Sequence, residues 1–365
     1  MRSVPTERPR RHVAATVAVL GLLAALEASA LGQTGSVDTH LGPVPLRAIS
    51  PLRLLFFQLT PEGPETLGAG ESMISIDISE SNVLHIRNSP ASEFDAEINL
   101  EISRVNVRFR RGVSERVDVG LELPVYRFHS GFLDSYIRNI EDLIGDQKVQ
   151  RVFEREFPGA GLFRFQLKRD GEVFFERPGP RSGLGDLALT VKRTLQKQSG
   201  WRPALSLRGA VKLPTGDDEH AMGSGDVDLA LGVAGALDWR RWHFHGTLNA
   251  TLPFGDPFEA VGLTTPPMVS GHLGFTRRIA PTWAFHFQLG GTSEPFEKID
   301  GREPSPLPSE PFENFGGSII DGTLGFSHTL GKRTELWIAL AEDFQNTTNA
   351  ASDVTLLASV NLRSW

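Results

Sequence analysis

The sequence predicts an all-β protein, an antiparallel up-and-down transmembrane β-barrel of about twelve strands with a short helix in one long outer loop. Apolar and polar residues alternate with a period of two in many segments, as they do in strands with one apolar and one polar face. The connections between these segments alternate between short and long, which is typical of outer-membrane barrels. The six Trp residues fall near short turns or at the C-terminus, and indole rings concentrate at membrane interfaces.

The composition excludes several classes of protein. The chain has 365 residues, no Cys and a formal net charge of −7. The absence of Cys excludes a disulfide framework and thiol chemistry, and the acidic balance argues against nucleic acid as a partner. The sequence contains no phosphate-binding loop, dinucleotide fingerprint or metalloprotease helix, so we expect no cofactor.

Residues 1–30 have the pattern of a secretory signal peptide. Basic residues up to Arg11 precede an apolar run from Val13 to Leu26, and Ala28-Ser29-Ala30 matches a cleavage site. A membrane anchor is the alternative, but a spanning helix needs about 20 apolar residues. An exported chain without a spanning helix crosses a membrane only as a closed barrel, which indicates the outer membrane of a Gram-negative cell.

Residues 31–70 form a Pro-rich N-terminal lead-in that we expect in the periplasm. Its apolar stretch from Leu52 to Leu59 has no clean alternation, so it does not read as a strand of the wall. A plug packed into the mouth of the barrel is the alternative for this stretch. The outer-membrane barrel is expected over residues 71–365.

The predicted wall strands follow one another along this region. In chain order, the alternating runs lie at 74–86, 98–109, 117–123, 187–191, 205–213, 227–233, 242–252, 269–275, 283–289, 320–326, 336–340 and 356–362. In the second run the phase slips by one near Ser103-Arg104, which predicts a β-bulge there. The long outer loop is 129–182. Helical spacing of its apolar residues predicts a short helix over 133–144, and residues 164–176 predict a hairpin.

Alternation also assigns the polar side chains of these strands to the lumen, because charged groups are costly in lipid. The predicted lumen-facing residues are Asp77, Asp118, Glu122, Asp186, Lys192, Arg208, Lys212, Asp226, Asp228, His243, His245, His272 and His286. Both signs of charge are present, which indicates a paired interior network. His243, His245 and His272 could instead hold a metal ion, but lumen solvation explains them equally simply.

The Trp residues are expected to form an interfacial aromatic girdle at the periplasmic rim. They are Trp201, Trp239, Trp242, Trp283, Trp337 and Trp365. An aromatic C-terminal residue is also a signal for the barrel-assembly machinery, although Trp365 lies out of phase with Leu362 and Val360.

Several stretches resemble a bacterial family known as domain of unknown function 3187. They are Gly42-Pro43-Val44-Pro45 with Ser50-Pro51-Leu52, Ser130-Gly131-Phe132-Leu133-Asp134 with Ile137, Gly183 to Leu187, and Lys212 to Gly216. The resemblance covers most of the chain after residue 30. It implies an outer-membrane barrel and supplies no catalytic residues.

These observations favour a narrow or plugged channel, or a binding barrel, for small solutes of unknown identity. The expected partners are outer-membrane lipids and lipopolysaccharide, together with the barrel-assembly machinery through Trp365. A lipid-modifying, lipase-like enzyme is one alternative, and it requires a Ser and a His within hydrogen-bond reach at the lipid-facing rim. His129-Ser130-Gly131 lacks the sequence context of outer-membrane lipases, so we interpret it as a turn. A structural or surface-interaction barrel is the other alternative.

Overall fold

A computed structural model of the chain describes residues 41–86, 94–131, 133, 163–296, 317–344 and 352–364. The predicted signal peptide lies outside the described residues, and so does the predicted helix over 133–144 apart from Leu133. Within the described residues, no helix has the length and apolar character needed to span a membrane.

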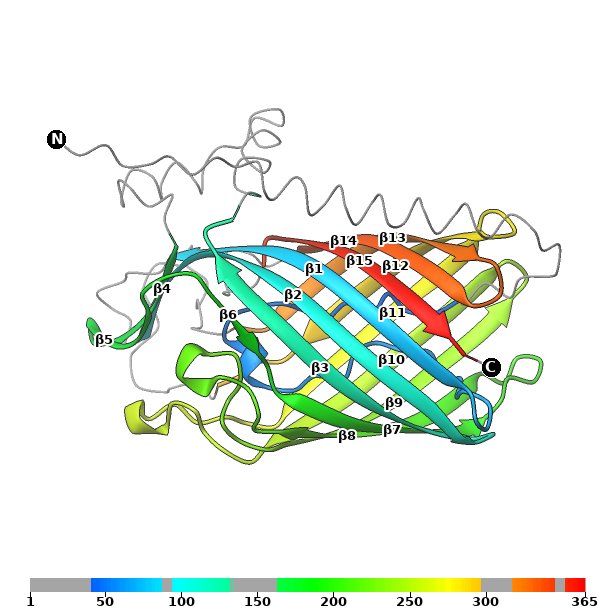
Figure 1. Ribbon diagram of the computed structural model, residues 1–365, viewed down its shortest axis with the longest axis horizontal. Helices are drawn as coiled ribbons and strands as arrows, with labels where there is room; N and C mark the ends of the chain where they lie inside the picture. Colours follow the sequence, from blue (N-terminus) through cyan, green and yellow to red (C-terminus); the bar gives the residue numbers. More distant parts are fainter. Residues whose placement is uncertain are drawn as a thin grey trace, which may run out of the picture.

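The prediction of a closed antiparallel barrel of twelve strands is confirmed (Figure 1). The strands are β1 Ser72–Ile86, β2 Phe94–Ser114, β3 Val117–His129, β4 Arg164–Arg169, β5 Glu172–Arg177, β6 Arg181–Leu184, β7 Leu187–Gln196, β8 Ala204–Leu213, β9 Asp228–Trp239, β10 Trp242–Pro253, β11 Met268–Arg278, β12 Trp283–Thr292, β13 Ile319–Leu330, β14 Thr334–Asp343 and β15 Val354–Arg363. The wall consists of β1, β2, β3 and β7 to β15, and β1 pairs with β15 to close it.

The three remaining strands lie at the end with the long loops. β6 continues the line of β7 along β3, and β4 and β5 form the predicted hairpin on the outer part of β2. In Figure 1 this end is on the left, and the short turns and the C-terminus are on the right. Because outer-membrane barrels have short periplasmic turns and long outer loops, the right-hand end is the periplasmic end.

Each wall strand presents one apolar face outward, as the alternation predicts. Ile74, Val107, Leu121, Leu273 and Ile338 are among many large apolar side chains that are more than a third exposed. Their polar neighbours in the strands are buried inside the ring. Exposed apolar surface of this extent on a closed barrel is the lipid-facing belt of a membrane protein.

The bulge predicted at Ser103-Arg104 is wrong. β2 keeps one register with β1 from Glu97 to Arg111, and its register shift with β3 falls between Gly112 and Ser114. The inward face of β2 is therefore continuous, although its character changes from apolar, at Ile98, Leu100 and Ile102, to cationic. The apolar part packs in the core above the belt with the β4–β5 hairpin, and this packing reverses the expected pattern.

Residues 41–68, which the sequence analysis placed in the periplasm, lie instead inside the barrel. The dark blue segment in Figure 1 runs within the ring of strands. From the periplasmic end it first follows β11 and β12, since Thr276 Oγ1 donates to Gly42 O (3.3 Å) and Gln288 Nε2 donates to Val44 O (3.4 Å). We call residues 41–68 the plug.

The plug turns back near the outer end of the lumen at the 3-10 helix η1, Arg53–Leu55. Arg53 Nη1 donates to Thr292 Oγ1 (3.2 Å), and its other donors reach backbone carbonyls at residues 293 and 317. Val44, Leu46, Ile49, Leu52 and Leu55 of the plug join the main apolar core. The turn is thus held by both buried apolar contacts and a fully buried guanidinium.

The second half of the plug returns to the periplasmic end along β3, β7 and β9. The backbone N–H of Phe57 donates to Asp228 (2.7 Å), Thr194 donates to Pro64 O (3.1 Å), and the N–H of Leu67 donates to Asp118 (3.2 Å). The chain then enters β1 at Ser72. The plug is therefore a hairpin-shaped insert whose described chain joins the wall at one end only.

Trp201, Trp239, Trp242 and Trp283 lie near the periplasmic turns with partly or largely exposed rings, as the girdle predicts. Trp201 and Trp239 contact each other with ring centroids 6.2 Å apart. The assignment of Trp337 to the girdle is wrong, because it is 3% exposed and its ring lies 4.2 Å from that of His286 in the lumen. Its neighbours Leu336 and Ile338 take the outward positions of β14, or the positions of the same phase. Trp365 lies outside the described residues.

Candidate functional site

The lumen is a charged cavity that the plug fills. Of the predicted lumen-facing residues, all but one are buried inside the ring: Asp77, Asp118, Glu122, Asp186, Lys192, Arg208, Lys212, Asp228, His243, His245, His272 and His286. The exception is Asp226, which is partly exposed in the loop before β9. Strand β9 begins two residues later than the alternation indicated, so Asp226 does not face the lumen from the wall.

A cluster of four cations surrounds Glu62 on the returning half of the plug. The Glu62 carboxylate lies 3.1 Å from Arg110 Nη1 and from Lys192 Nζ, 3.5 Å from Arg208 Nη2 and 3.7 Å from Arg108 Nη1. The cations come from β2, β7 and β8. Since all five groups are largely shielded from water, their attraction is weakly screened.

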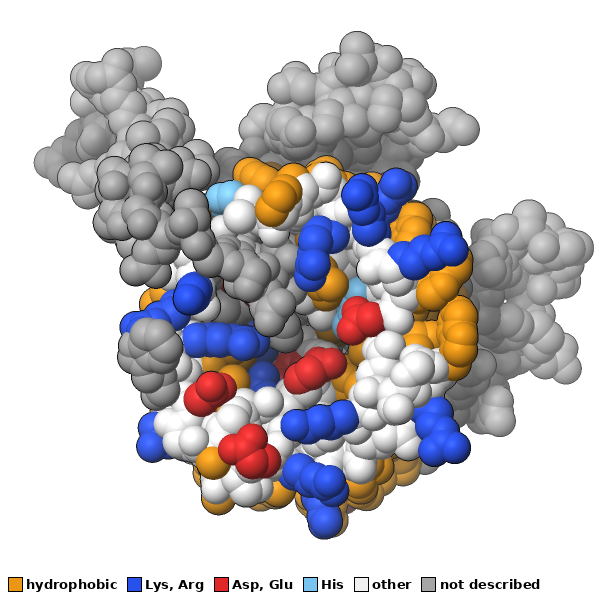
Figure 2. All heavy atoms as spheres, turned by 90° about the vertical axis from the view of Figure 1, so that its right-hand side faces the viewer, with side chains coloured by type: hydrophobic (Ala, Val, Ile, Leu, Met, Phe, Trp, Pro, Cys, Tyr) orange, Lys and Arg blue, Asp and Glu red, His pale blue; other side chains and the backbone are white. Residues whose placement is uncertain are grey.

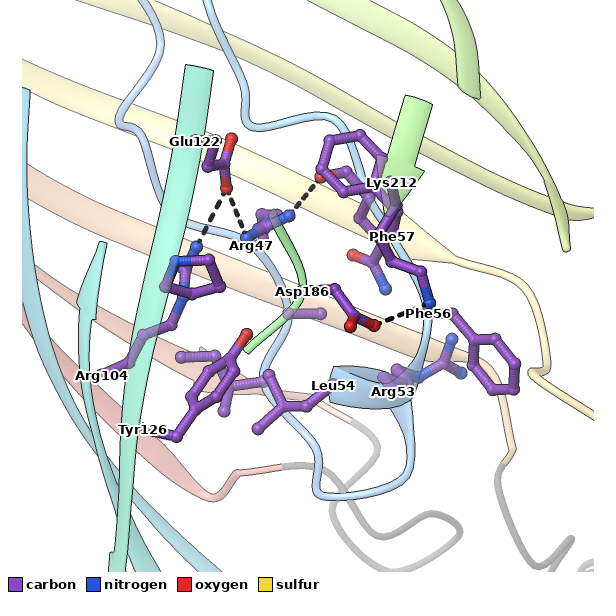
Figure 3. A pocket seen from close by; sticks show the side chains of 14 residues that line it. Arg47, Arg53, Leu54, Phe56, Phe57, Arg104, Glu122, Tyr126, Asp186 and Lys212 are labelled. Atoms are coloured by element: carbon purple, nitrogen blue, oxygen red, sulfur yellow. Dashed lines mark hydrogen bonds and ion pairs between the residues drawn. The ribbon is translucent and has the colours of Figure 1, made fainter. Parts of the chain in front are cut away.

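A second cluster lies further toward the outer end, as Figure 3 shows. Arg47 of the plug and Arg104 of β2 both donate to the Glu122 carboxylate, at 2.7 and 3.3 Å. Thr60 Oγ1 is 3.2 Å from the other oxygen of Glu122. A single wall carboxylate thus contacts both halves of the plug, which fixes their spacing.

The third cluster explains two of the stretches that carry the family resemblance. Lys212 Nζ lies 3.0 Å from Asp186 and 3.2 Å from Asp228, and donates to Leu55 O of the plug (2.9 Å). Asp186 also accepts from the N–H groups of Thr215 (3.0 Å) and Gly216 (2.8 Å). The Lys212 to Gly216 stretch therefore turns around one carboxylate and holds the plug through one ammonium group.

Sequence reasoning missed six charged residues of these clusters: Arg47, Arg53, Glu62, Arg104, Arg108 and Arg110. The three Arg residues of β2 alternate with Val105, Val107 and Phe109, so strict alternation would have identified them. No such signal exists for the plug, because an irregular segment has no periodicity that points its side chains.

The four lumen histidines are not brought together as a metal site. His286 contacts Thr276 and Ser327, each at 2.8 Å, and His272 lies 3.3 Å from Thr247. His243 contacts Asp238 at 2.8 Å. Among the residues that the structure describes, the group with metal-ligand spacing is instead Glu80, Glu101 and His129, whose ligand atoms lie within 4.8 Å of one another.

That group lies on the outward face of the first three strands and includes Ser103. Ser103 Oγ is 2.8 Å from His129 Nε2 and donates to Glu80 (2.7 Å). The distance meets the requirement for a lipase, but the connectivity does not. The N–H of Gly131 donates to His129 Nδ1 (3.0 Å), so Nε2 carries the proton, and Glu80 contacts this same nitrogen (3.0 Å). His129 therefore cannot accept the Ser103 proton as a triad base does.

The acidic stretch 216–219 in the β8–β9 loop is also internally paired. Asp217 contacts His220 Nδ1 at 2.7 Å and Arg181 Nη2 at 3.5 Å. Burial alone would raise the pKa of Asp217, but the His220 hydrogen bond and the Arg181 charge outweigh it and lower that pKa. This loop is thus an ordered polar cap at the outer end.

A cavity of about 190 Å³ remains between the plug and the wall toward the periplasmic end. Glu62, Arg108, Arg110 and Lys192 line its charged side. Its apolar side is formed by Trp337, Met73 and prolines of the plug: Pro43, Pro45 and Pro61.

A closed barrel with a lipid-facing apolar belt and a charged lumen defines the class of outer-membrane β-barrels. Within this class, the chain belongs to the family described as "Protein of unknown function (DUF3187)", whose model matches residues 20–363. No curated protein matches the chain significantly.

Solved structures share the fold. The crystal structure of an outer membrane channel from Pseudomonas putida F1 is 14% identical, with a TM-score of 0.53 over 84% of this chain and 100% of that chain. NanC porin is 6% identical, with a TM-score of 0.42 over 79% and 98%. The toluene transporter TbuX of Ralstonia pickettii is 10% identical, with a TM-score of 0.38 over 93% and 98%.

Proposed function

We propose that this protein is a narrow outer-membrane channel for small solutes, in which the plug occupies the pore and must shift for solute to pass. The observation that carries this proposal is the plug itself, a segment threaded through a charged lumen. A barrel with a purely structural role has no need of a polar lumen, because apolar packing fills an interior at lower desolvation cost.

The contacts of the plug support a segment that moves without unfolding the wall. Its hydrogen bonds reach side chains of the wall, such as Asp118, Thr194 and Asp228, and replace none of the strand-to-strand bonds. Water can satisfy the same groups once the plug shifts. The printed description of the Pseudomonas putida protein as an outer membrane channel agrees with this proposal.

The proposed partners follow from the fold. The apolar belt contacts outer-membrane lipids, and lipopolysaccharide is the outer-leaflet lipid that the long loops would meet. Insertion through the barrel-assembly machinery with Trp365 as part of the signal remains a proposal of the sequence.

Reconstitution of the full chain tests the channel. In planar bilayers we expect small single-channel steps, and in liposomes we expect swelling in small solutes that falls off steeply with solute size. Complete absence of both, with correctly folded protein in the bilayer, contradicts a channel.

A further inference from the structure

We propose that the cluster around Glu62 is a binding seat for the carboxylate group of a small organic anion, and that Glu62 occupies this seat in place of the solute. The inference rests on the proposed channel, and it names the class of solute that the channel passes. The seat consists of Arg108, Arg110, Lys192 and Arg208.

The charges of the seat are incompletely balanced by the wall. Arg108 pairs with Asp77 (2.8 Å) and Arg110 contacts Asp118, so these two cations have wall partners. Among the described residues, Lys192 and Arg208 pair only with Glu62 of the plug. When the plug shifts, two cations deep in the lumen lose their counter-charge.

The remaining polar contacts of the same two side chains also lie on the plug. Lys192 Nζ donates to Gly63 O (3.2 Å), and Arg208 Nη2 donates to Thr60 O (2.6 Å). Arg208 Nη1 and Arg110 Nε are buried without a hydrogen-bond partner even with the plug in place. A buried donor without a partner is costly, so an incoming group with several acceptor oxygens gains these bonds. A carboxylate is such a group.

The cavity beside the seat limits the rest of the solute. Its volume of about 190 Å³ is similar to cavities that hold one benzene-sized molecule, roughly 150 Å³. Trp337, Pro61 and Met73 supply apolar contacts opposite the charged side. The site therefore fits a small molecule with one carboxylate and a compact apolar body.

The periplasmic rim favours the same sign of solute. Figure 2 looks onto this end and shows Lys and Arg side chains around it. They include the exposed Arg111, Arg116, Lys197, Arg240, Arg277 and Lys332 at or near the short turns. A basic rim on a chain of net charge −7 raises the local concentration of anions at the mouth nearest the seat.

The test is a calorimetric titration of the folded full chain in detergent, with benzoate as the probe and benzamide as its neutral counterpart. Glu62→Gln removes the internal carboxylate and keeps the four cations. We expect this variant to bind benzoate about tenfold more tightly than the wild type, and to prefer it over benzamide by about tenfold or more, as for one charge-assisted hydrogen bond.

Lys192→Met in the Glu62→Gln background should weaken benzoate binding by about tenfold, and Lys197→Met, which removes an exposed rim cation, should leave it unchanged. A gain of affinity in Glu62→Gln cannot arise from misfolding. Equal affinity for benzoate and benzamide, or no benzoate binding to Glu62→Gln, overturns the seat. Because binding is measured without transport, a protein that binds benzoate but forms no channel refutes the proposed function and leaves the seat standing.

Discussion

At the scale of single residues, Asp228 connects the plug to the wall. It is fully buried, accepts from the N–H of Phe57 at 2.7 Å and pairs with Lys212 at 3.2 Å. Replacing it by Asn keeps the shape and removes the charge from both contacts.

We expect Asp228→Asn to lower the free energy of unfolding by about 1–3 kcal/mol, the range for a buried hydrogen bond to a charged group. Guanidinium titration of the folded barrel in detergent measures this change. Asp226→Asn is the matched control, because Asp226 lies partly exposed in the loop, and it should change stability by less than about 0.5 kcal/mol. Equal effects of the two variants contradict the contact.

The positions of the Trp residues give a second prediction at this scale. In variants that keep a single Trp, phospholipids carrying bromine on their acyl chains should quench Trp239, which is 40% exposed on the outer surface. The same lipids should leave Trp337 nearly unquenched, because its ring contacts His286 inside the lumen. Strong quenching of Trp337 by lipid means that β14 has the opposite face toward the bilayer.

At the scale of elements, the junction between the plug and β1 depends on close backbone approach at Gly112. The N–H of Gly112 donates to Glu71 O, and its carbonyl accepts from Gly70, both at 2.9 Å. A Cβ atom at Gly112 would lie 2.0 Å from Gly68 O, so no other residue fits without moving the plug.

Gly112→Ala should therefore displace the lower end of the plug and expose it to protease. The measurement is the rate of cleavage between residues 60 and 70 in the folded protein, and we expect it to rise several-fold, in line with about 1 kcal/mol of local destabilisation. Gly179→Ala is the control, since nothing lies within 4 Å of the added atom. Unchanged cleavage in Gly112→Ala contradicts the tight junction.

The elements also show what the sequence could predict. Strand positions followed from alternation because a residue between lipid and lumen must suit both sides. Alternation failed in outer β2, where Ile98 and Leu100 face a protein core instead of water. It also gave no account of the plug, whose path depends on contacts with strands far away in sequence, such as Thr276 and Gln288.

At the scale of the whole molecule, the wall and the plug divide the roles. The wall supplies the membrane-facing surface and the fixed charges, and the plug supplies Arg47, Arg53 and Glu62, which neutralise or bridge those charges. Sequence patterns predicted the closed barrel and its charged lumen. They could not decide whether the lumen was open, because that depends on where 28 irregular residues, 41–68, are placed.

The central claim, that the plug closes the pore and must shift for solute to pass, is tested most directly by a reversible tether. Thr66 Oγ1 of the plug and Thr194 Oγ1 of β7 lie 3.1 Å apart, and the chain has no Cys of its own. In Thr66→Cys/Thr194→Cys, a disulfide would fix the plug four residues from Glu62.

The measurement is solute flux into liposomes before and after reduction of this bond, with each single-Cys variant as a control. We predict low flux while the disulfide is intact and a return to the wild-type rate on reduction. Wild-type flux through the oxidised, fully cross-linked protein would contradict the claim, because solute would then pass without movement of the plug.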